Sequence, residues 1–305
     1  MSNVLVIGGG SRIASAMRSM YPGCYDYVIR SDSLPAQPAT GTFDTPSTQF
    51  HPVRSYADLT AEDFCDYQLV INLVGTTMGS PDQLMAVNSE LLGHFAEQAA
   101  HAGVKHFIAL SSFSVYGLAP SIDAVTPINP ISAYGRSRVS GERNLERFSE
   151  QMACTIARCP ILYGAGESKL ERLIAAWGKI GALPVPTDPV HRSMVHYDLA
   201  ARYLHEVAHS DRVQPGLYID HFADPVMFEY RRAAQIISQA TGARKRLLPL
   251  PSFVRHILIK LVPQIARSLY CDSVLVQEQN YFRDRSDSRI ENDIAAIASR
   301  IRSAA

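Results

Sequence analysis

The sequence predicts an α/β protein, in which a doubly wound parallel sheet is followed by a smaller C-terminal lobe. Short, continuously apolar runs alternate with longer stretches of helical periodicity through the first half of the chain. Strands that are apolar on both faces are typical of parallel sheets covered by helices on both sides. The alternation of apolar strands and helices is expected to stop where the sheet ends. Beyond Pro160 the alternation of strands and helices becomes irregular and prolines become frequent, which favours a loop-rich lobe. These prolines are Pro184, Pro186, Pro189, Pro249, Pro251 and Pro263.

The expected elements follow the chain in a regular order. Apolar, β-rich runs predict strands at Val4–Ile7, Tyr27–Ile29, Phe50–Val53, Leu69–Val74, Phe107–Leu110, Thr155–Ala157 and Leu217–Ile219. Helical periodicity predicts helices from about Ile13 and at Gln83–Ala102, Tyr134–Phe148, Leu199–His209, Phe228–Thr241 and Ile290–Ile301. We therefore expect residues 1–160 to form one domain, with its sheet completed by segments within 193–221. Residues 161–305 would mainly form the smaller, substrate-binding lobe.

The composition bears on three properties, namely binding to nucleic acid, disulfide formation and membrane insertion. The 29 Lys and Arg residues balance 29 Asp and Glu residues, and no basic stripe is interleaved with aromatic residues, so nucleic acid is not an expected partner. The five cysteines are scattered and form no Cys-x-x-Cys pair, which predicts free thiols in a reducing, cytoplasmic environment. No stretch approaches the ~20 uninterrupted apolar residues of a membrane span.

The segment Phe253–Leu269 comes closest to such a span, but basic residues and a proline interrupt it. Its apolar residues recur at helical spacing, which predicts an amphipathic helix that packs on its own domain. A helix that lies on a membrane surface is the alternative interpretation.

A glycine-rich turn follows the first strand, in the run Val4-Leu-Val-Ile-Gly-Gly-Gly-Ser-Arg-Ile-Ala14. A strand, a tight glycine turn and a helix start bring backbone N–H groups close to a pyrophosphate, as in Rossmann-type dinucleotide sites. Ser11 and Ala14 stand where such sites often carry glycine, yet both are small enough for close packing. An ordinary strand–helix turn is the alternative.

The end of the second strand bears on which nicotinamide cofactor would bind. NAD sites usually place Asp or Glu there to accept from the adenine ribose hydroxyls. Here Arg30 occupies or neighbours that place, and a guanidinium suits the 2′-phosphate of NADP(H). Arg12 in the glycine turn adds a second positive charge, whereas Asp32 favours NAD(H). The sequence alone therefore favours NADP(H), with NAD(H) as the alternative.

A serine, a tyrosine and an arginine form the candidate catalytic group. Ser112 lies at the end of a strand, in Ser111-Ser-Phe-Ser-Val-Tyr-Gly117. Tyr134 and Arg138 follow at i and i+4, so they share one helix face. A cation beside a phenol favours the phenolate, which makes Tyr134 a usable acid or base, while Ser112 is placed to bond a substrate oxygen. A surface Tyr–Arg pair without chemistry is the alternative.

With these segments in this order, the chain resembles an extended short-chain dehydrogenase/reductase of the NAD-dependent epimerase/dehydratase group, which acts on nucleotide sugars. The resemblance covers most of the first 210 residues. It also rests on Val70-Ile-Asn-Leu-Val-Gly75, Arg158-Cys-Pro-Ile-Leu-Tyr-Gly164 and Arg192-Ser-Met-Val-His-Tyr-Asp-Leu-Ala200. Arg138 departs from the family pattern, which has lysine there, and this puts full activity in question. A homodimer formed by paired helices is usual in the proteins it resembles.

The resemblance implies a role for further positions. The cofactor would be contacted by Gly8, Gly10, Ser11, Arg12, Ile13, Arg30, Asp58, Leu59, Val74, Gly75, Asn88, Tyr134, Arg138, Pro160 and Ile161. Asp58 and Leu59 would lie near the adenine, and Pro160 and Ile161 near the nicotinamide. Ser114 and Arg192 would bind the substrate, the latter through its phosphates.

The same site serves several activities, so alternatives stay open. Arg30 favours a reductase that reduces a 4-keto nucleotide sugar with NADPH. An epimerase that retains NAD and returns the hydride is the alternative, and a non-catalytic protein that senses NADP(H) is a third possibility.

One further motif points elsewhere. His205-Glu-Val-Ala-His209 matches the H-E-x-x-H pattern of zinc proteases, and Glu229 could be offered as a third ligand. Because the motif lies in a helix that covers the sheet in the resembled fold, we interpret it as a helix face and expect no metal site.

Overall fold

The structure is a computed structural model that describes residues 3–33, 48–164, 182–241, 246–261, 272–285 and 289–303. Contacts divide the chain into two compact units. The first, here called the sheet unit, consists of Met1–Val115, Ser132–Arg158 and Tyr197–Asp220. The second, the C-terminal unit, consists of Tyr116–Ile131, Cys159–His196 and His221–Ala305.

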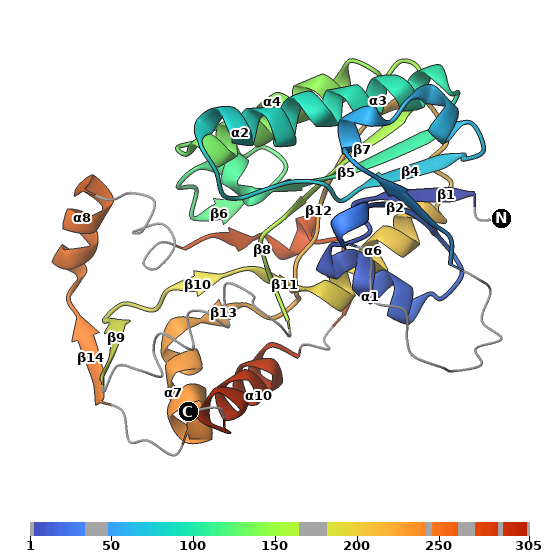
Figure 1. Cartoon of the computed structure of the whole chain (residues 1–305). Coiled ribbons are helices and arrows are strands. Elements are labelled where there is room, and N and C mark those ends of the chain that lie inside the picture. Colours follow the sequence, from blue (N-terminus) through green and yellow to red (C-terminus); the bar gives the residue numbers. More distant parts are fainter. Residues whose placement is uncertain are drawn as a thin grey trace. The chain divides into compact units, whose positions relative to one another are not determined.

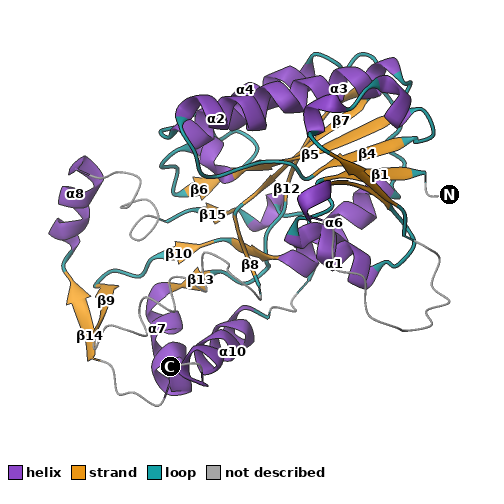
Figure 2. Ribbon diagram, in the orientation of Figure 1, coloured by secondary structure: helices purple, strands orange, loops and turns teal. Residues whose placement is uncertain are grey.

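A seven-stranded sheet forms the centre of the sheet unit (Figures 1 and 2). Its neighbouring pairs β3–β2, β2–β1, β1–β4 and β4–β5 are parallel, which confirms the predicted fold class. The jump from β1 to β4 is the reversal of strand order that defines a doubly wound sheet. In order across the sheet the strands are β3 (Phe50–Val53), β2 (Asp26–Arg30), β1 (Val4–Ile7), β4 (Leu69–Asn72), β5 (His106–Ser112), β7 (Ala153–Cys159) and β12 (Gly216–His221).

Helices cover both faces of this sheet. Figure 1 shows α2, α3 and α4 on one face and α1 and α6 on the other. The helix expected at 83–102 is divided, because a π-helical turn at Ala86–Glu90 separates its first turn from the rest. The helices are α1 (Arg12–Met20), α2 (Pro81–Met85), α3 (Leu91–His101), α4 (Ala133–Glu146) and α6 (Tyr197–Ala208).

The strands that the sequence marks as continuously apolar are buried along their length. All four residues of β1 and of β4 are buried, and they pack with α3 into one hydrophobic core that includes Phe95 and Phe107. Burial on both faces explains why neither strand shows the alternating pattern of a half-exposed strand. This core fixes the edge at which the strands end and the helices begin.

The C-terminal unit is built from short strand pairs and a separate core. Its pairs are β6 (Ser121–Ile122) with β15 (Val274–Leu275), β8 (Ile161–Tyr163) with β11 (Met194–His196), β9 (Ala182–Pro186) with β14 (Arg246–Leu250), and β10 (His191–Arg192) with β13 (Phe228–Glu229). Helices α7 (Tyr230–Thr241) and α10 (Ile290–Ser303) pack together, and their core includes Phe228 of β13 and Ile294 of α10. Helix α8 covers Ser252–Leu261. None of the described helices is long and apolar enough to cross a membrane.

A buried histidine predicts how the sheet unit responds to acid. His106, on β5, is 2% exposed, and its Nε2 lies 2.8 Å from Thr155 Oγ1 in a hydrogen bond. Burial and, to a lesser degree, the nearby Arg212 guanidinium lower the pKa of His106 to about 4. Because the unfolded chain protonates near pH ~6.5, the folded state loses stability as the pH falls from about 6.5 towards 4.

We therefore expect His106→Gln, which keeps a neutral hydrogen-bonding group, to remove up to about 3 kcal/mol of this acid-dependent loss. The measurement is the free energy of unfolding in urea at a series of pH values. His101→Gln, at an exposed position ending α3, is the matched control and should leave the profile unchanged. An identical pH profile for His106→Gln and the unmodified chain would contradict the prediction.

Candidate active site

Tyr134 and Arg138 meet at the beginning of α4. Ser132 begins this helix, since its hydroxyl accepts a hydrogen bond from the Gly135 amide at 3.0 Å. One turn apart, Arg138 Nε donates to Tyr134 Oη at 3.3 Å, and the guanidinium carbon lies 5.3 Å from the centre of the tyrosine ring. Both side chains are partly exposed. The pair therefore brings a cation within hydrogen-bond distance of the phenol oxygen.

The sheet holds the other end of the Arg138 guanidinium. Its Nη1 donates to the backbone carbonyl of Leu110 in β5 at 3.1 Å. A Cβ placed on Gly75, in the loop after β4, would collide with Nη2 of Arg138. The guanidinium thus fills the space that a side chain at position 75 would need, and hydrogen bonds hold it from α4 and from β5.

Ser112 ends β5, on the same stretch of chain as Leu110. Its hydroxyl accepts from the Ser114 amide at 3.2 Å and lies 3.3 Å from the Ser114 hydroxyl. Within the described residues, no hydrogen bond joins Ser112 to Tyr134. The structure therefore places the two serines together and the Tyr–Arg pair together. It describes no direct link between these two pairs.

A buried ion pair lies further along the same face of α4. Glu142, one turn beyond Arg138, accepts two hydrogen bonds from Arg158 in β7, from Nε at 3.0 Å and from Nη2 at 2.6 Å. The Ser111 hydroxyl also donates to Glu142, at 2.5 Å. The Arg158 and Glu142 side chains are only 7% and 8% exposed. This network ties α4 to both β5 and β7. No sequence motif marks Glu142, although its i+8 spacing from Tyr134 indicates that it shares the helix face.

The glycine turn is shaped by close backbone packing. Gly8 has a φ of 95°, and a Cβ there would come within 3.0 Å of the Leu73 carbonyl carbon and the Val74 amide nitrogen. Only glycine adopts this conformation without strain and allows β1 to approach the loop after β4 so closely. The amides of Gly8 and Gly9 both donate to the Val28 carbonyl, at 3.1 and 2.9 Å.

Helix α1 begins directly after this turn. The hydroxyl of Ser11 accepts from the Ala14 amide at 3.1 Å, which makes Ser11 the capping residue. Gly10, Arg12 and Ile13 surround the helix N-terminus, where first-turn N–H groups and the helix dipole favour an anion. The guanidinium of Arg12 lies 5.9 Å from the centre of the Tyr197 ring.

A second arginine supports the turn from the end of α1, and sequence reasoning missed it. Arg18 Nη1 donates to the Gly9 carbonyl at 2.6 Å, and its guanidinium lies over the rings of Tyr27 and Phe50. No spacing pattern marks this contact, because it depends on the curvature of the turn. Arg18 acts as a positioning residue for the glycine turn.

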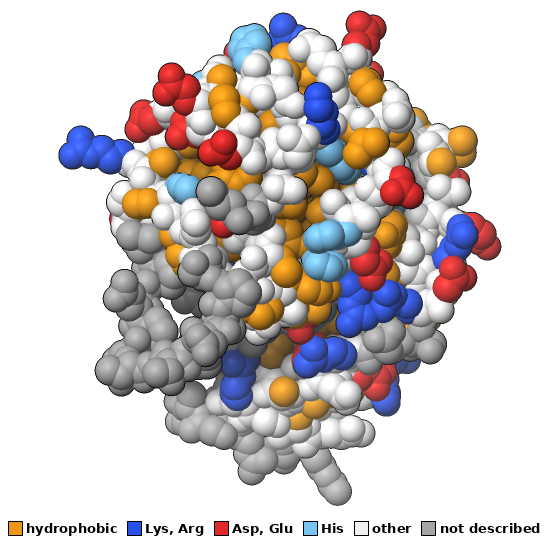
Figure 3. Space-filling view, turned by 90° about the vertical axis from the view of Figure 1, so that its right-hand side faces the viewer, with side chains coloured by type: hydrophobic (Ala, Val, Ile, Leu, Met, Phe, Trp, Pro, Cys, Tyr) orange, Lys and Arg blue, Asp and Glu red, His pale blue; other side chains and the backbone are white. Residues whose placement is uncertain are grey.

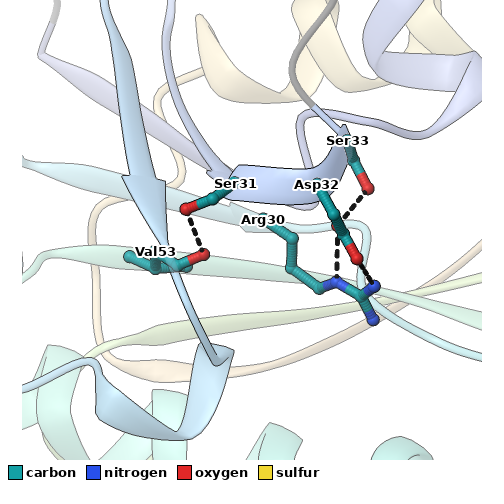
Figure 4. Close-up of polar contacts among 5 residues, drawn as sticks. All are labelled: Arg30, Ser31, Asp32, Ser33 and Val53. Atoms are coloured by element: carbon teal, nitrogen blue, oxygen red, sulfur yellow. Dashed lines mark hydrogen bonds and ion pairs between the residues drawn. The ribbon is translucent and has the colours of Figure 1, made fainter.

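The end of β2 carries an arginine that is already paired (Figure 4). Arg30 Nε donates to Asp32 Oδ1 at 3.1 Å, and Nη2 contacts Asp32 Oδ2. The hydrogen bonds from Arg30 and Ser33 hold the pKa of Asp32 below its usual value. Both side chains of the pair are more than half exposed. The positive charge of Arg30 is therefore balanced locally.

The remaining predicted cofactor residues of the sheet unit have structural partners. Asp58 Oδ2 accepts from the Ser55 amide and caps a short 3₁₀ helix, and the Leu59 side chain is buried in the core. The Val74 amide donates to Asn72 Oδ1 at 2.9 Å. Asn88, 1% exposed, bonds both backbone groups of Thr76 and the Ser137 hydroxyl. Asn88 therefore links the loop after β4 to α4 through hydrogen bonds. A direct contact of Asn88 with a cofactor stays a prediction.

Three predicted site residues belong to the C-terminal unit. Pro160 and Ile161 lie where β8 begins, and Ile161 pairs with Met194 of β11. Arg192 is buried on β10, where it pairs with Phe228 of β13. Their roles near the nicotinamide and the substrate stay predictions.

The histidines of the H-E-x-x-H motif take part in aromatic packing. His205 Nδ1 forms a 2.6 Å hydrogen bond with Tyr25 Oη, and its ring stacks on Tyr21 at 3.7 Å. His209 Nδ1 bonds the His205 backbone carbonyl at 2.8 Å. Glu229 belongs to the C-terminal unit and accepts from the amides that begin α7. Among the described residues, no group of three His, Cys, Asp or Glu side chains is arranged to hold a metal ion.

Comparison with known protein families places this geometry in context. The sequence matches the NAD dependent epimerase/dehydratase family over residues 4–182. The match begins at β1 and spans the glycine turn, the Tyr134–Arg138 pair and the Glu142–Arg158 network. A comparison with curated proteins found no match.

Several solved structures share the fold along nearly the whole chain. The Bordetella bronchiseptica enzyme WbmH, in complex with NAD⁺, has a TM-score of 0.72 at 16% identity, with 98% of each chain covered. A UDP-glucuronic acid 4-epimerase from Bacillus cereus, in complex with NAD, has a TM-score of 0.70 at 16% identity, covering 98% of this chain and 96% of that one. A dTDP-4-dehydrorhamnose reductase ortholog from Clostridium acetobutylicum has a TM-score of 0.61 at 17% identity, covering 81% and 83%. At these identities the likeness concerns the fold.

Proposed function

The chain belongs to the NAD-dependent epimerase/dehydratase family, and we propose that it interconverts an alcohol and a ketone on the sugar of a nucleotide sugar. The observation that carries this proposal is the Tyr134–Arg138 pair, held against Leu110 and Gly75 at the end of the sheet. Ligands of doubly wound sheets bind outside the carboxyl ends of the strands, where this pair lies.

The residues of the sheet unit fit a dinucleotide. Gly8 allows the tight turn that leads into α1, and the N-terminus of α1 favours the negative charge of a pyrophosphate. A bound nicotinamide supplies the hydride acceptor and donor. Tyr134 takes the hydroxyl proton when the alcohol is oxidised and returns it when the ketone is reduced. Arg138 stabilises the phenolate between these two steps, and Ser112 donates a hydrogen bond to the substrate oxygen.

The Arg30–Asp32 pair supports NAD(H) as the cofactor, where sequence alone favours NADP(H). A 2′-phosphate is a dianion, and it would meet the Asp32 carboxylate together with the Arg30 guanidinium. Adenine ribose hydroxyls, in contrast, donate well to a carboxylate at the end of β2. The similar WbmH and UDP-glucuronic acid 4-epimerase structures are complexes with NAD.

With NAD(H), the reaction that fits best is epimerisation, in which the hydride is removed from the sugar and returned within one turnover. A reductase that uses NADPH on a 4-keto nucleotide sugar is the second candidate. Two positive charges, Arg30 at the end of β2 and Arg12 at the start of α1, favour a 2′-phosphate, and the exposed Arg30–Asp32 ion pair opens at little cost. In either case we propose that the C-terminal unit binds the sugar nucleotide, with Arg192 among the contacts, and that Ser114 of the sheet unit also binds the substrate.

The experiment that separates these activities is to identify the nucleotide released when the purified protein is denatured. Retained NAD, together with interconversion of a UDP-sugar such as UDP-glucuronic acid, would support the epimerase. An empty site that binds NADPH and oxidises it with dTDP-4-dehydrorhamnose would support the reductase. Binding of either cofactor without turnover of any sugar nucleotide would contradict both and leave a sensor of the cofactor.

Cofactor preference gives a prediction of its own. Asp32→Asn should shift the ratio of NADH to NADPH affinity towards NADPH by about tenfold, because it removes a like charge and releases the Arg30 guanidinium. Fluorescence titration of both reduced cofactors measures this ratio. Asp63→Asn, which also removes an exposed carboxylate that caps a 3₁₀ helix, is the control. An unchanged ratio in Asp32→Asn would show that this pair does not contact the adenine ribose.

A further inference from the structure

Helix α8 exposes three large apolar side chains. Phe253, Ile257 and Leu261 are 64%, 48% and 74% exposed. They are spaced by four residues, so they lie along one face of the helix. The sequence predicts that this helix packs on its own domain, but these three side chains do not. Contiguous exposed apolar surface of this kind is typical of sites that bind a protein or a membrane.

No described helix or strand packs extensively against α8. Helix α7 of the same unit packs on α10, β9 and β13, whereas α8 makes no comparable contact with any described element. In Figure 2, α8 lies beyond the end of β14, the strand that precedes it in the chain. The described part of the chain therefore does not cover the apolar face.

The charge around this helix is unbalanced in the sequence. The whole chain has 29 basic and 29 acidic residues, but residues 242–271 contain no Asp or Glu. The six basic residues of this segment are Arg244, Lys245, Arg246, Arg255, Lys260 and Arg267. The remaining residues therefore carry an excess of acids. The face in Figure 3, by comparison, shows acidic and basic side chains close together. The basic excess belongs to this segment and is not a general property of the protein.

Lys260 connects the two observations. It is exposed and follows Phe253 by seven residues, which is about two helical turns, so it lies at the edge of the apolar face. A lysine at such an edge lays its methylene stem along apolar surroundings and keeps its ammonium in a polar layer. We call Phe253, Ile257, Lys260 and Leu261 the α8 face.

We propose that the α8 face docks on an anionic lipid bilayer. Its apolar side chains enter the boundary between headgroups and acyl chains, and Lys260 meets the lipid phosphates. A second copy of the chain is a poorer partner for this face. In a two-fold contact the same patch lies on both sides, so it would place two exposed Lys260 ammonium groups in one interface.

The test is flotation of the full chain with vesicles, which does not depend on enzyme activity. We expect binding to vesicles of phosphatidylcholine and phosphatidylglycerol in equal parts, and little binding to phosphatidylcholine alone. Phe253→Ser combined with Leu261→Ser should weaken binding at least about tenfold, because two apolar anchors are lost from an exposed face. Val125→Ser, at an 86% exposed position outside α8, is the matched control and should bind as the unmodified chain does.

Charge and oligomeric state give the remaining outcomes. Lys260→Glu should weaken binding to the anionic vesicles by roughly tenfold, and added salt should do the same. Absence of vesicle binding, or equal binding by the Phe253→Ser/Leu261→Ser variant, would overturn the proposal. A dimer in sedimentation that this double variant converts to monomer, without vesicle binding, would also overturn it, since a second copy would then be the occupant.

Discussion

Tyr134→Phe is expected to slow hydride transfer by about 10²–10⁴-fold while nicotinamide binding is retained. The substitution removes only the hydroxyl that receives a hydrogen bond from Arg138 Nε. Without it, Tyr134 cannot exchange the proton of the substrate alcohol, whereas the ring still fills the same space. The measurement is single-turnover change in the absorbance of the reduced nicotinamide, with a sugar nucleotide that the unmodified protein turns over.

Arg138 provides the controls. Arg138→Lys should keep most of the activity, since an ammonium also stabilises the phenolate. Gly75→Ala should lower the rate, because the new Cβ displaces the Arg138 guanidinium from its place beside Leu110. Combined with Arg138→Lys, Gly75→Ala should cost less, as lysine has no second branch to collide. Full activity in Tyr134→Phe would refute the proposed role of the tyrosine.

The parts of the site that follow from local pattern were predictable from sequence. Val4–Ile7 is a strand because four apolar residues precede a glycine turn that only glycine can make. Tyr134 and Arg138 share a face because residues four apart always do so in a helix. The apolar strands also predicted the doubly wound sheet, since burial on both faces requires helices on both sides.

Contacts between distant segments were not predictable in this way. The Arg18 bond to the Gly9 carbonyl and the Asn88 bonds to Thr76 depend on how loops curve, and a single sequence does not record such curvature. Arg30 is an example. The sequence favours NADP(H) from the charge of Arg30 and names Asp32 as the opposing residue, but it does not show that the two side chains bond each other.

Arg158→Met is expected to destabilise the sheet unit by about 3–5 kcal/mol, which is the cost of leaving a buried carboxylate without its cation. Glu142 is 8% exposed and receives two hydrogen bonds from Arg158, so the water that would otherwise solvate its charge is largely excluded. Chemical unfolding in urea measures the loss. Arg143→Met, one residue after Glu142 and exposed on α4, is the matched control and should change stability by less than about 0.5 kcal/mol.

The double variant Glu142→Leu/Arg158→Met separates the charge from the packing. Removing both charges leaves no uncompensated ion, so we expect it to recover most of the stability that Arg158→Met alone loses. It should still slow catalysis, because Glu142 lies two turns from Tyr134 on α4 and bonds Ser111, the neighbour of Ser112. If the double variant were as unstable as the single one, the cost would lie in packing around Arg158. If it were fully active, the ion pair would stabilise the fold without positioning the tyrosine.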